Sequence, residues 1–205
     1  MRQFWHESTT GESWNLLQKL AKSRNFVLIG GWAAYLHTRT QKSKDIDIVV
    51  DFEELRHLDA EFRLLKNERL GKYEIKQDDV DVDVYVPKLS RLAYPPEKLL
   101  KKYEIIDGIM VAGVSQLLLL KLGAYADRKG SSKGEKDAID IVSLLYGTEF
   151  DKADFEKAAK DASVERPVEM LKEIVSQFPG SSLEFVGAGF LEFKKWRGGF
   201  LKRLA

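Results

Sequence analysis

Cysteine is absent from this 205-residue sequence, and histidine is scarce. The lack of cysteine excludes disulfide bonds, thiolate metal sites and cysteine nucleophiles. The three histidines, His6, His37 and His57, share no metal-ligand spacing such as i, i+4, so we expect no zinc site. His37 follows a glycine pair but is more typical of a structural histidine than of a ligand, and we assign it no role.

Long hydrophobic runs are also missing. The longest, Val114–Leu122, is interrupted by Ser115, Gln116 and Lys121 and is far shorter than a membrane span. The N-terminal residues contain no apolar signal-peptide core. The formal net charge of +1 gives no overall bias toward nucleic acid or membrane. We therefore expect a soluble, cytoplasmic protein with no membrane partner, in which any nucleic-acid contact needs a local patch.

The residues that are present suffice for a folded core, because 44% are hydrophobic and 32% charged. The patterns predict an α/β half up to about residue 110 and a helical half beyond it. We expect a catalytic core over residues 1–112 and a helical region over 113–205. Helices are predicted over 11–23, 32–37, 53–66, 116–129, 135–146, 151–162 and 167–178, strands over 26–29, 45–50 and 80–86, and a hairpin over 105–111.

Two details of the helical half are predicted separately. Ser115 is a candidate N-cap for the helix over 116–129. Beyond Leu183, the glycines are expected to interrupt any helix; they are Gly187, Gly189, Gly198 and Gly199.

Paired aspartates carry the first chemical signal. Asp45 and Asp47 alternate with isoleucines in a predicted strand, so their side chains point to the same face. Two carboxylates held this close repel each other unless a cation lies between them. Hard divalent ions such as Mg²⁺ prefer such oxygen ligands. The alternative is that both aspartates are solvated on an exposed strand face, although aspartate is depleted in strands.

A second strand repeats this arrangement with Asp81 and Asp83 in the run VDVDVYV. If the two strands are neighbours, three or four carboxylates converge on one patch. Such a cluster can hold two Mg²⁺ ions roughly 3.5–4 Å apart, which would clamp the attacking and leaving oxygens of a phosphoryl displacement. Two separate, exposed acidic strands remain the alternative.

A glycine pair, Gly30-Gly31, lies at a predicted strand-to-helix junction. Glycines let backbone N–H groups approach an anion, and a helix N-terminus favours phosphate. A lone pair of glycines is most often only a turn. Here a short predicted helix separates the pair from the first two aspartates, which favours a shared site.

The glycine pair, thirteen residues, the DID run and a later VDV run together resemble the signature of the DNA polymerase β-like nucleotidyltransferase superfamily. The resemblance implies an α/β (α+β) nucleotidyltransferase core with a small mixed sheet, followed by a C-terminal helical region. It implies that Gly30 and Gly31 hold the phosphates of a nucleoside triphosphate (NTP) substrate. Many relatives have serine as the second small residue, so Gly31 offers only its backbone N–H.

The same resemblance implies roles for the acids. Asp45 and Asp47 would bind the metals, two Mg²⁺ ions with Mn²⁺ as a substitute. A third acid would serve as metal ligand and general base. Asp83 matches this position best because of its VDVYVP context, and Asp81 on the same face is the second choice.

Downstream, the run LKLGAYADR followed by Lys136-Asp137 is similar to a segment of the minimal and abortive-infection-type nucleotidyltransferases. That similarity implies that Lys121 contacts the triphosphate and that Arg128 and Asp137 belong to the nucleotide site. The structural alternatives are that Lys121 lies at the edge of the core and that Arg128 and Asp137 form an ion pair between two helices.

The end of the chain combines basic and aromatic residues. Lys194, Lys195, Arg197, Lys202 and Arg203 occur among Phe190, Phe193, Trp196 and Phe200. Such a stretch can track and stack on RNA. An amphipathic segment that packs on its own domain, on a second copy or on a partner protein explains it equally well.

The function expected from these features is metal-dependent transfer of a nucleoside monophosphate to an acceptor hydroxyl with release of pyrophosphate. The acceptor, whether an RNA or tRNA 3′ end, a protein or a small molecule, stays open. The alternative is a non-catalytic protein of the same fold that acts as a binding or antitoxin-like partner.

Overall fold

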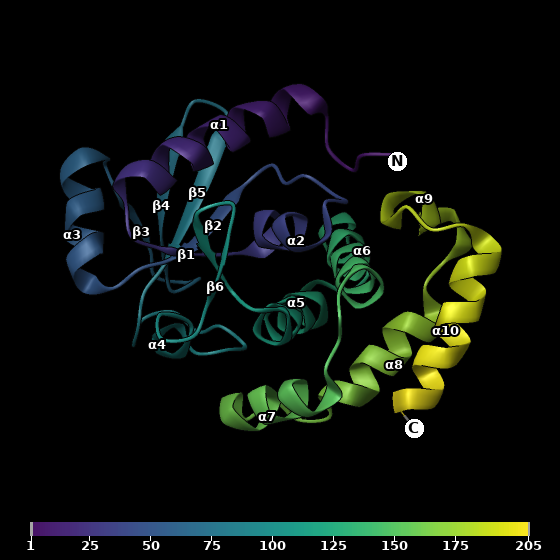
Figure 1. Ribbon diagram of the computed structural model, residues 1–205. Helices are drawn as coiled ribbons and strands as arrows, with labels where there is room; N and C mark the ends of the chain where they lie inside the picture. Colours follow the sequence, from purple (N-terminus) through teal and green to yellow (C-terminus); the bar gives the residue numbers. More distant parts are fainter. Residues whose placement is uncertain (1, 205) are drawn as a thin grey trace.

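The computed structural model describes residues 2–204, and its centre is a seven-stranded sheet (Figure 1). The strand order is β3-β4-β5-β2-β1-β7-β6. The strands are β1 (Val27–Ile29), β2 (Ile46–Val49), β3 (Leu65–Asn67), β4 (Lys72–Gln77), β5 (Val80–Tyr85), β6 (Glu104–Ile106) and β7 (Ile109–Val111). The pairs β2–β5 and β1–β7 are parallel and the other neighbours are antiparallel, so the sheet is mixed.

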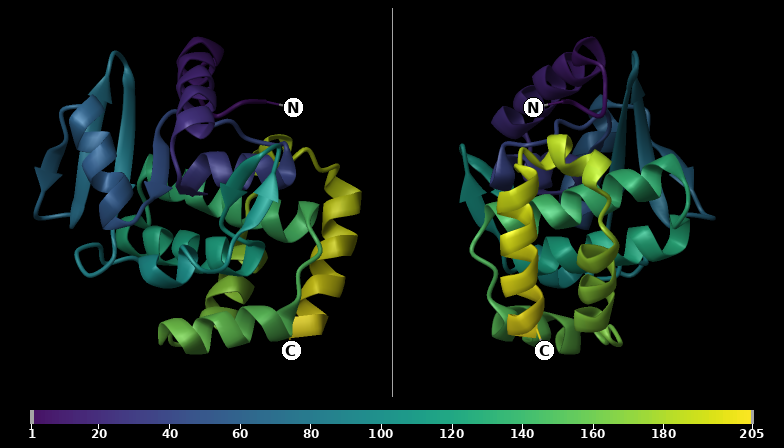
Figure 2. Two further views of the ribbon diagram at one scale, coloured as in Figure 1. Left: turned by 60° about the vertical axis from the view of Figure 1, so that its left-hand side comes forward. Right: turned by 90° about the vertical axis from the view of Figure 1, so that its right-hand side faces the viewer.

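Helices cover the sheet and extend away from it. They are α1 (Glu7–Ser23), α2 (Gly30–Thr38), α3 (Phe52–Glu61), α4 (Pro96–Leu99), α5 (Val114–Arg128), α6 (Ser132–Gly147), α7 (Lys152–Ala162), α8 (Pro167–Gln177), a 3₁₀ turn (Gly180–Ser182), α9 (Leu183–Val186) and α10 (Phe190–Leu204). α2 contacts β1 and β2 as well as α5 and α6, so it lies between the sheet and this helix pair. α7, α8 and α10 form an outer group that packs on α5 and α6 (Figure 2).

None of the helices described in residues 2–204 is long and apolar enough to cross a membrane.

The fold class predicted from the sequence is confirmed: a mixed α/β core with a helical C-terminal region. The last strand ends at Val111 and α5 begins at Val114, close to the predicted change of character. Buried hydrophobic side chains form a cluster that runs from Leu17 on α1 to Phe200 on α10. The division at residue 112 into two domains stays a prediction.

One predicted helix is wrong at its end. The helix expected over 53–66 stops at Glu61, and Leu65–Asn67 forms β3 instead. The strand β4, over Lys72–Gln77, was not predicted. The apolar residues at the end of the predicted helix fit a helical period, but Leu65 is exposed on an edge strand. β3 pairs with β4 and β4 with β5, both antiparallel, and this strand pairing outweighs the helical pattern.

Two further details differ from the sequence prediction. Gly113 rather than Ser115 is the N-cap of α5, and Ser115 lies inside the helix. α10 continues through Gly198 and Gly199. Neither glycine has a neighbouring atom where a Cβ would lie, so the helix gains nothing from them locally. Burial of one face of α10 against the outer helices outweighs the cost of about 1 kcal/mol for each glycine.

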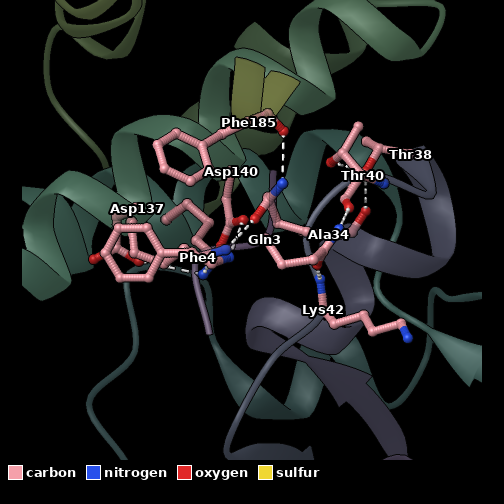
Figure 3. Close-up of polar contacts among 12 residues, drawn as sticks. Gln3, Phe4, Ala34, Thr38, Thr40, Lys42, Asp137, Asp140 and Phe185 are labelled. Atoms are coloured by element: carbon pink, nitrogen blue, oxygen red, sulfur yellow. Dashed lines mark hydrogen bonds and ion pairs between the residues drawn. The ribbon is translucent and has the colours of Figure 1, made fainter. Parts of the chain in front are cut away.

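A buried glutamine ties the N-terminal segment to the rest of the protein. Gln41 is 0% exposed. Its Oε1 accepts a 2.8 Å hydrogen bond from the Phe4 N–H, and its Nε2 donates to the carbonyls of Arg2 and Phe185. Figure 3 shows the hydrogen bonds that join Gln3 and Phe4 to the loop after α2, and the bond from this loop to the Phe185 carbonyl. Gln41 therefore joins the first residues of the chain to α9.

Replacing Gln41 by alanine should destabilise the protein by about 2–3 kcal/mol, because buried backbone groups lose their partners. The free energy of unfolding in urea measures this loss, and limited proteolysis should cut the N-terminal segment faster. Gln3→Ala is the control, because exposed Gln3 makes similar hydrogen bonds that water can replace. Equal losses in the two variants would contradict the assigned role of Gln41.

Candidate active site

A cavity of about 770 Å³ lies where the sheet meets α2, α5 and α6, and it contains groups of both charges. Its acidic lining includes Asp45, Asp47, Asp83, Asp137 and Asp140, and its basic lining includes Lys72, Arg91, Lys121, Arg128, Lys133 and Lys136. Gly30 and Gly31 also line it. The residues that the sequence singled out are therefore gathered in one place.

Parallel pairing of β2 with β5 brings the acids together. Asp47 lies directly beside Asp83 in the register of the two strands. The alternation of β5 buries its valines and turns its polar residues toward the cavity side. Asp81 does not line the cavity, and its carboxylate is paired with Lys76 at 2.9 Å. The geometry thus favours Asp83 over Asp81 as the third acid.

The acids repel one another. Burial raises the pKa of Asp47 to about 6, and the charges of Asp83 and Asp45 add to this effect. Burial also raises the pKa of Asp83, although its 2.6 Å ion pair with Lys72 acts in the opposite direction. The Tyr85 hydroxyl donates a 3.4 Å hydrogen bond to Asp47. Without a further cation, this cluster is electrostatically unfavourable.

The carboxylates of Asp45, Asp47 and Asp83 are suitable ligands for a divalent cation, but their side chains are not arranged as a complete coordination site. Within residues 2–204, no three carboxylate or imidazole groups converge closely enough to enclose an ion. Asp45 Oδ1 is buried with no hydrogen-bond partner, and such an oxygen is unfavourable unless something binds it. Asp83 is drawn toward Lys72, whose ammonium group supplies positive charge to the cluster.

Gly30 sits in contact with the acid pair. Its φ of +70° is a left-handed conformation that favours glycine, and a Cβ at this position would lie 2.0 Å from Asp47 Oδ2. The start of α2 can therefore approach the carboxylate only because residue 30 has no side chain.

Gly30→Ala should lower the free energy of unfolding by about 1–3 kcal/mol for the backbone, with a further loss from the clash. Asp47 must move to make room for the added methyl group. Gly108→Ala is the matched control: its φ is +77° but its Cβ would meet no atom within 4 Å. Urea unfolding compares the variants, and an identical response of both would rule out the close contact.

A buried ion network forms the opposite wall of the cavity. Lys121 on α5 is 7% exposed and lies 2.7 Å from Asp140 and 3.2 Å from Asp137, both on α6. Arg128 pairs with Asp137 at 2.6 Å, and Lys136 hydrogen-bonds to Asp140. Burial alone would lower the pKa of Lys121, but Asp140 and Asp137 raise it, so the lysine stays charged. The network joins α5 to α6 and holds positive charge near Asp47.

These contacts bear on the two interpretations of the basic residues. The ion pair between Arg128 and Asp137 is present and connects two helices. Lys121 is not a surface lysine at the edge of the core. Its ammonium group donates a hydrogen bond to Asp137, lies 2.7 Å from Asp140 and lines the cavity.

Sequence reasoning missed several lining residues. Lys72 and Arg91 were not predicted, and neither was Ser43, two positions before Asp45. Lys72 lies on β4, whose alternation of Tyr73 and Ile75 with polar residues was the available signal. The only signal for Ser43 in the sequence was its position close to Asp45.

Two features outside the cavity have structural uses. The His37 ring Nε2 lies 2.9 Å from the Ala112 carbonyl oxygen, which agrees with a structural histidine. On α10, Phe193 and Phe200 are buried and pack against Phe178 and Phe150 respectively. These two aromatic rings are therefore used in packing rather than free to stack on bases.

Comparison with known proteins adds information about the fold. No protein-family model and no curated protein matches the chain. The structure is similar to the crystal structure of JHP933 from Helicobacter pylori, with a TM-score of 0.54 and 18% identity over 97% of this chain and 94% of that one. A crystal structure of an antigenic nucleotidyltransferase-like protein from Paracoccidioides brasiliensis has a TM-score of 0.42 and 17% identity over 80% of this chain and 92% of that one. The likeness to JHP933 concerns the fold alone, a mixed sheet followed by a helical C-terminal region.

Proposed function

We propose that the protein is a metal-dependent nucleotidyltransferase that moves a nucleoside monophosphate from an NTP to an acceptor hydroxyl. The observation that carries this proposal is the register of β2 and β5. It places Asp47 beside Asp83 in a cavity that also contains the glycine junction and a basic wall. A carboxylate cluster facing positive charge suits a metal–triphosphate substrate, because both of its charged parts find a partner.

Asp45, Asp47 and Asp83 would hold Mg²⁺, with Mn²⁺ as a substitute. The unpartnered oxygen of Asp45 and the raised pKa of Asp47 support this assignment. Asp83 would give up its ion pair with Lys72 in order to bind the metal ion. The bound ions would supply positive charge at the transferred phosphoryl group and at the attacking and leaving oxygens.

The phosphate chain would lie between the glycine junction and the ion network. The N-terminus of α2 presents backbone N–H groups at Gly30 and Gly31, where an anion is favoured. Lys121 would contribute its positive charge from the opposite wall. Arg128 would add charge, while Asp137 would act by holding both Lys121 and Arg128 in place.

In the reaction, the acceptor oxygen forms a bond to the α-phosphorus and the bond from that phosphorus to the bridging oxygen of the β-phosphate breaks. Pyrophosphate leaves. Asp83 takes the proton of the acceptor hydroxyl as general base.

The acceptor is an RNA 3′ end such as that of tRNA, a protein hydroxyl or a small molecule, and it is left to experiment. We also propose, from the run LKLGAYADR and Lys136-Asp137, that the protein is related to the abortive-infection-type nucleotidyltransferases. The exposed basic residues of α10 offer a contact surface for RNA, for a partner protein or for a second copy of the chain.

The test is incubation of the purified protein with Mg²⁺ and each α-labelled NTP in turn, together with cellular RNA and protein. Label in RNA, in protein or in a small product would identify the acceptor class. If nothing is labelled and calorimetry detects no binding of any NTP, the proposal fails. A non-catalytic partner protein of the same fold would then be the better description.

A further inference from the structure

A lysine side chain contacts the third acid of the cavity. Lys72 lies on β4, and its side chain is only 12% exposed. Its Nζ lies 2.6 Å from Asp83 Oδ2 and 3.2 Å from Glu74 Oε1. Lys72 and Asp83 line the cavity, whereas Glu74 lies outside its lining. The ammonium group therefore bridges a carboxylate inside the cavity and a carboxylate beside it.

The strand register explains this arrangement. Lys72 and Glu74 are two residues apart on β4, so their side chains point to the same face of the sheet. Glu74 lies opposite Asp83 in the pairing of β4 with β5, and Asp83 lies opposite Asp47 in the pairing of β5 with β2. Three carboxylates thus form a row across adjacent strands, and Lys72 contacts the first two of them.

Lys72 and a divalent cation would compete for Asp83. The contact between Nζ and Asp83 Oδ2 has the length of a strong, charge-assisted ion pair. A metal ion bound by the same carboxylate would lie close to the ammonium group, and the two positive charges would repel each other. Binding of the metal ion by Asp83 therefore requires Lys72 to move away.

Glu74 is the partner to which Lys72 can move. Its Oε1 already lies 3.2 Å from Lys72 Nζ and accepts a 2.9 Å hydrogen bond from Asn67 Nδ2 on β3. This hydrogen bond holds the Glu74 carboxylate in place at the side of the cavity. Lys72 would keep one carboxylate partner after leaving Asp83, so its half-buried charge would not be left uncompensated.

We infer that Lys72 is the resident cation of the acid cluster, which neutralises Asp83 until a divalent ion displaces it onto Glu74. The inference rests on the proposed function and adds the control of metal binding by a residue outside the motif. Lys72 is a positioning residue in this role. It sets the concentration of divalent ion at which Asp83 becomes a ligand.

Calorimetric titration with Mn²⁺ tests this role through binding rather than turnover. Lys72→Met should bind Mn²⁺ roughly tenfold more tightly than the wild type, because the ion no longer has to displace an ion pair. Lys76→Met is the matched control. Lys76 lies on the same strand and contacts Glu74 and Asp81, but within residues 2–204 it forms no ion pair with Asp83. Its loss should change the Mn²⁺ affinity by no more than about threefold.

Glu74→Gln separates displacement of Lys72 from a general effect of charge. In the wild-type background it should weaken Mn²⁺ binding, because Lys72 loses its second partner and stays on Asp83. In the Lys72→Met background the same substitution should have much less effect, because there is no ammonium group to receive. Equal effects of Glu74→Gln in both backgrounds would refute the exchange.

A crystal structure of the wild type with Mn²⁺ and a non-hydrolysable NTP analogue tests the exchange without any variant. Lys72 should lie on Glu74 and beyond ion-pair distance of Asp83. If Mn²⁺ is bound and Lys72 still contacts Asp83, the inference is refuted and the proposed function stands.

The titrations also distinguish this inference from the proposed function. If the wild type binds Mn²⁺ and Lys72→Met binds it equally or more weakly, Lys72 does not compete with the ion, and only the inference fails. If neither protein binds Mn²⁺, even with the NTP analogue present, the proposed function and this inference fall together.

Discussion

Asp47→Asn should abolish nucleotidyl transfer and leave the fold intact. Asp47 lies at the centre of the acid cluster, beside Asp83 and in contact with the start of α2. An amide is a poor substitute for a carboxylate as a ligand of a divalent ion. Loss of several kcal/mol of transition-state stabilisation corresponds to a fall in rate of about 10³-fold or more.

The matched control is Asp81→Asn, two residues before Asp83 on the same strand. Asp81 is paired with Lys76 and does not line the cavity, so its loss should leave transfer nearly unchanged. Asp83→Asn should behave like Asp47→Asn. If Asp81→Asn were inactive and Asp83→Asn active, the third acid would be Asp81.

The same Asp47 variant has an expected signature in stability. The pKa of Asp47 is raised from 3.8 to about 6, mainly by burial, so the folded state holds its proton more tightly than the unfolded state. The wild type therefore loses stability as the pH rises from about 4 to about 6, by up to about 3 kcal/mol. Asp47→Asn lacks this loss. Urea midpoints of the metal-free proteins across this range should fall for the wild type relative to the variant.

Lys121→Met should destabilise the contact between α5 and α6. It leaves Asp137 and Asp140 buried, each about 1% exposed, without the ammonium group that both contact. Asp137 keeps its ion pair with Arg128 and Asp140 keeps Lys136, so the expected cost is that of the lost contacts of Lys121, about 1–3 kcal/mol. The free energy of unfolding in urea at neutral pH measures the effect.

Lys102→Met provides the comparison, since Lys102 forms an ion pair with Asp154 whose side chains are 60% and 41% exposed. Its urea midpoint should stay close to that of the wild type. Equal midpoints for the Lys121 and Lys102 variants would show that the network does not hold α5 to α6.

The sequence predicted the parts of the site that depend on local patterns. Alternation of aspartate with aliphatic residues is enough to place Asp45 and Asp47 on one face of a strand. The parallel pairing that sets Asp47 beside Asp83 could only be assumed, because strand register depends on contacts far apart in the chain.

The residues that sequence reasoning missed are placed by strand pairing and loop packing rather than by a motif. Lys72 reaches Asp83 only because β4 pairs with β5, and this strand was hidden beside a segment with a helical pattern. Ser43 lies near Asp45 in sequence, but its approach to Gly31 depends on how the loop after α2 folds back. The ion pairs of Lys121 with Asp137 and Asp140 likewise depend on the packing of α5 on α6, which the sequence does not reveal.

The central claim is that this cavity transfers a nucleoside monophosphate, and parallel reactions with α-labelled and γ-labelled NTP test it most directly. With Mg²⁺ and the acceptor fraction present, the α-label should appear in the acceptor and the γ-label in pyrophosphate. Both signals should vanish in Asp47→Asn. Transfer of the γ-label to an acceptor would contradict the account, as would α-label transfer that persists in the Asp47 variant.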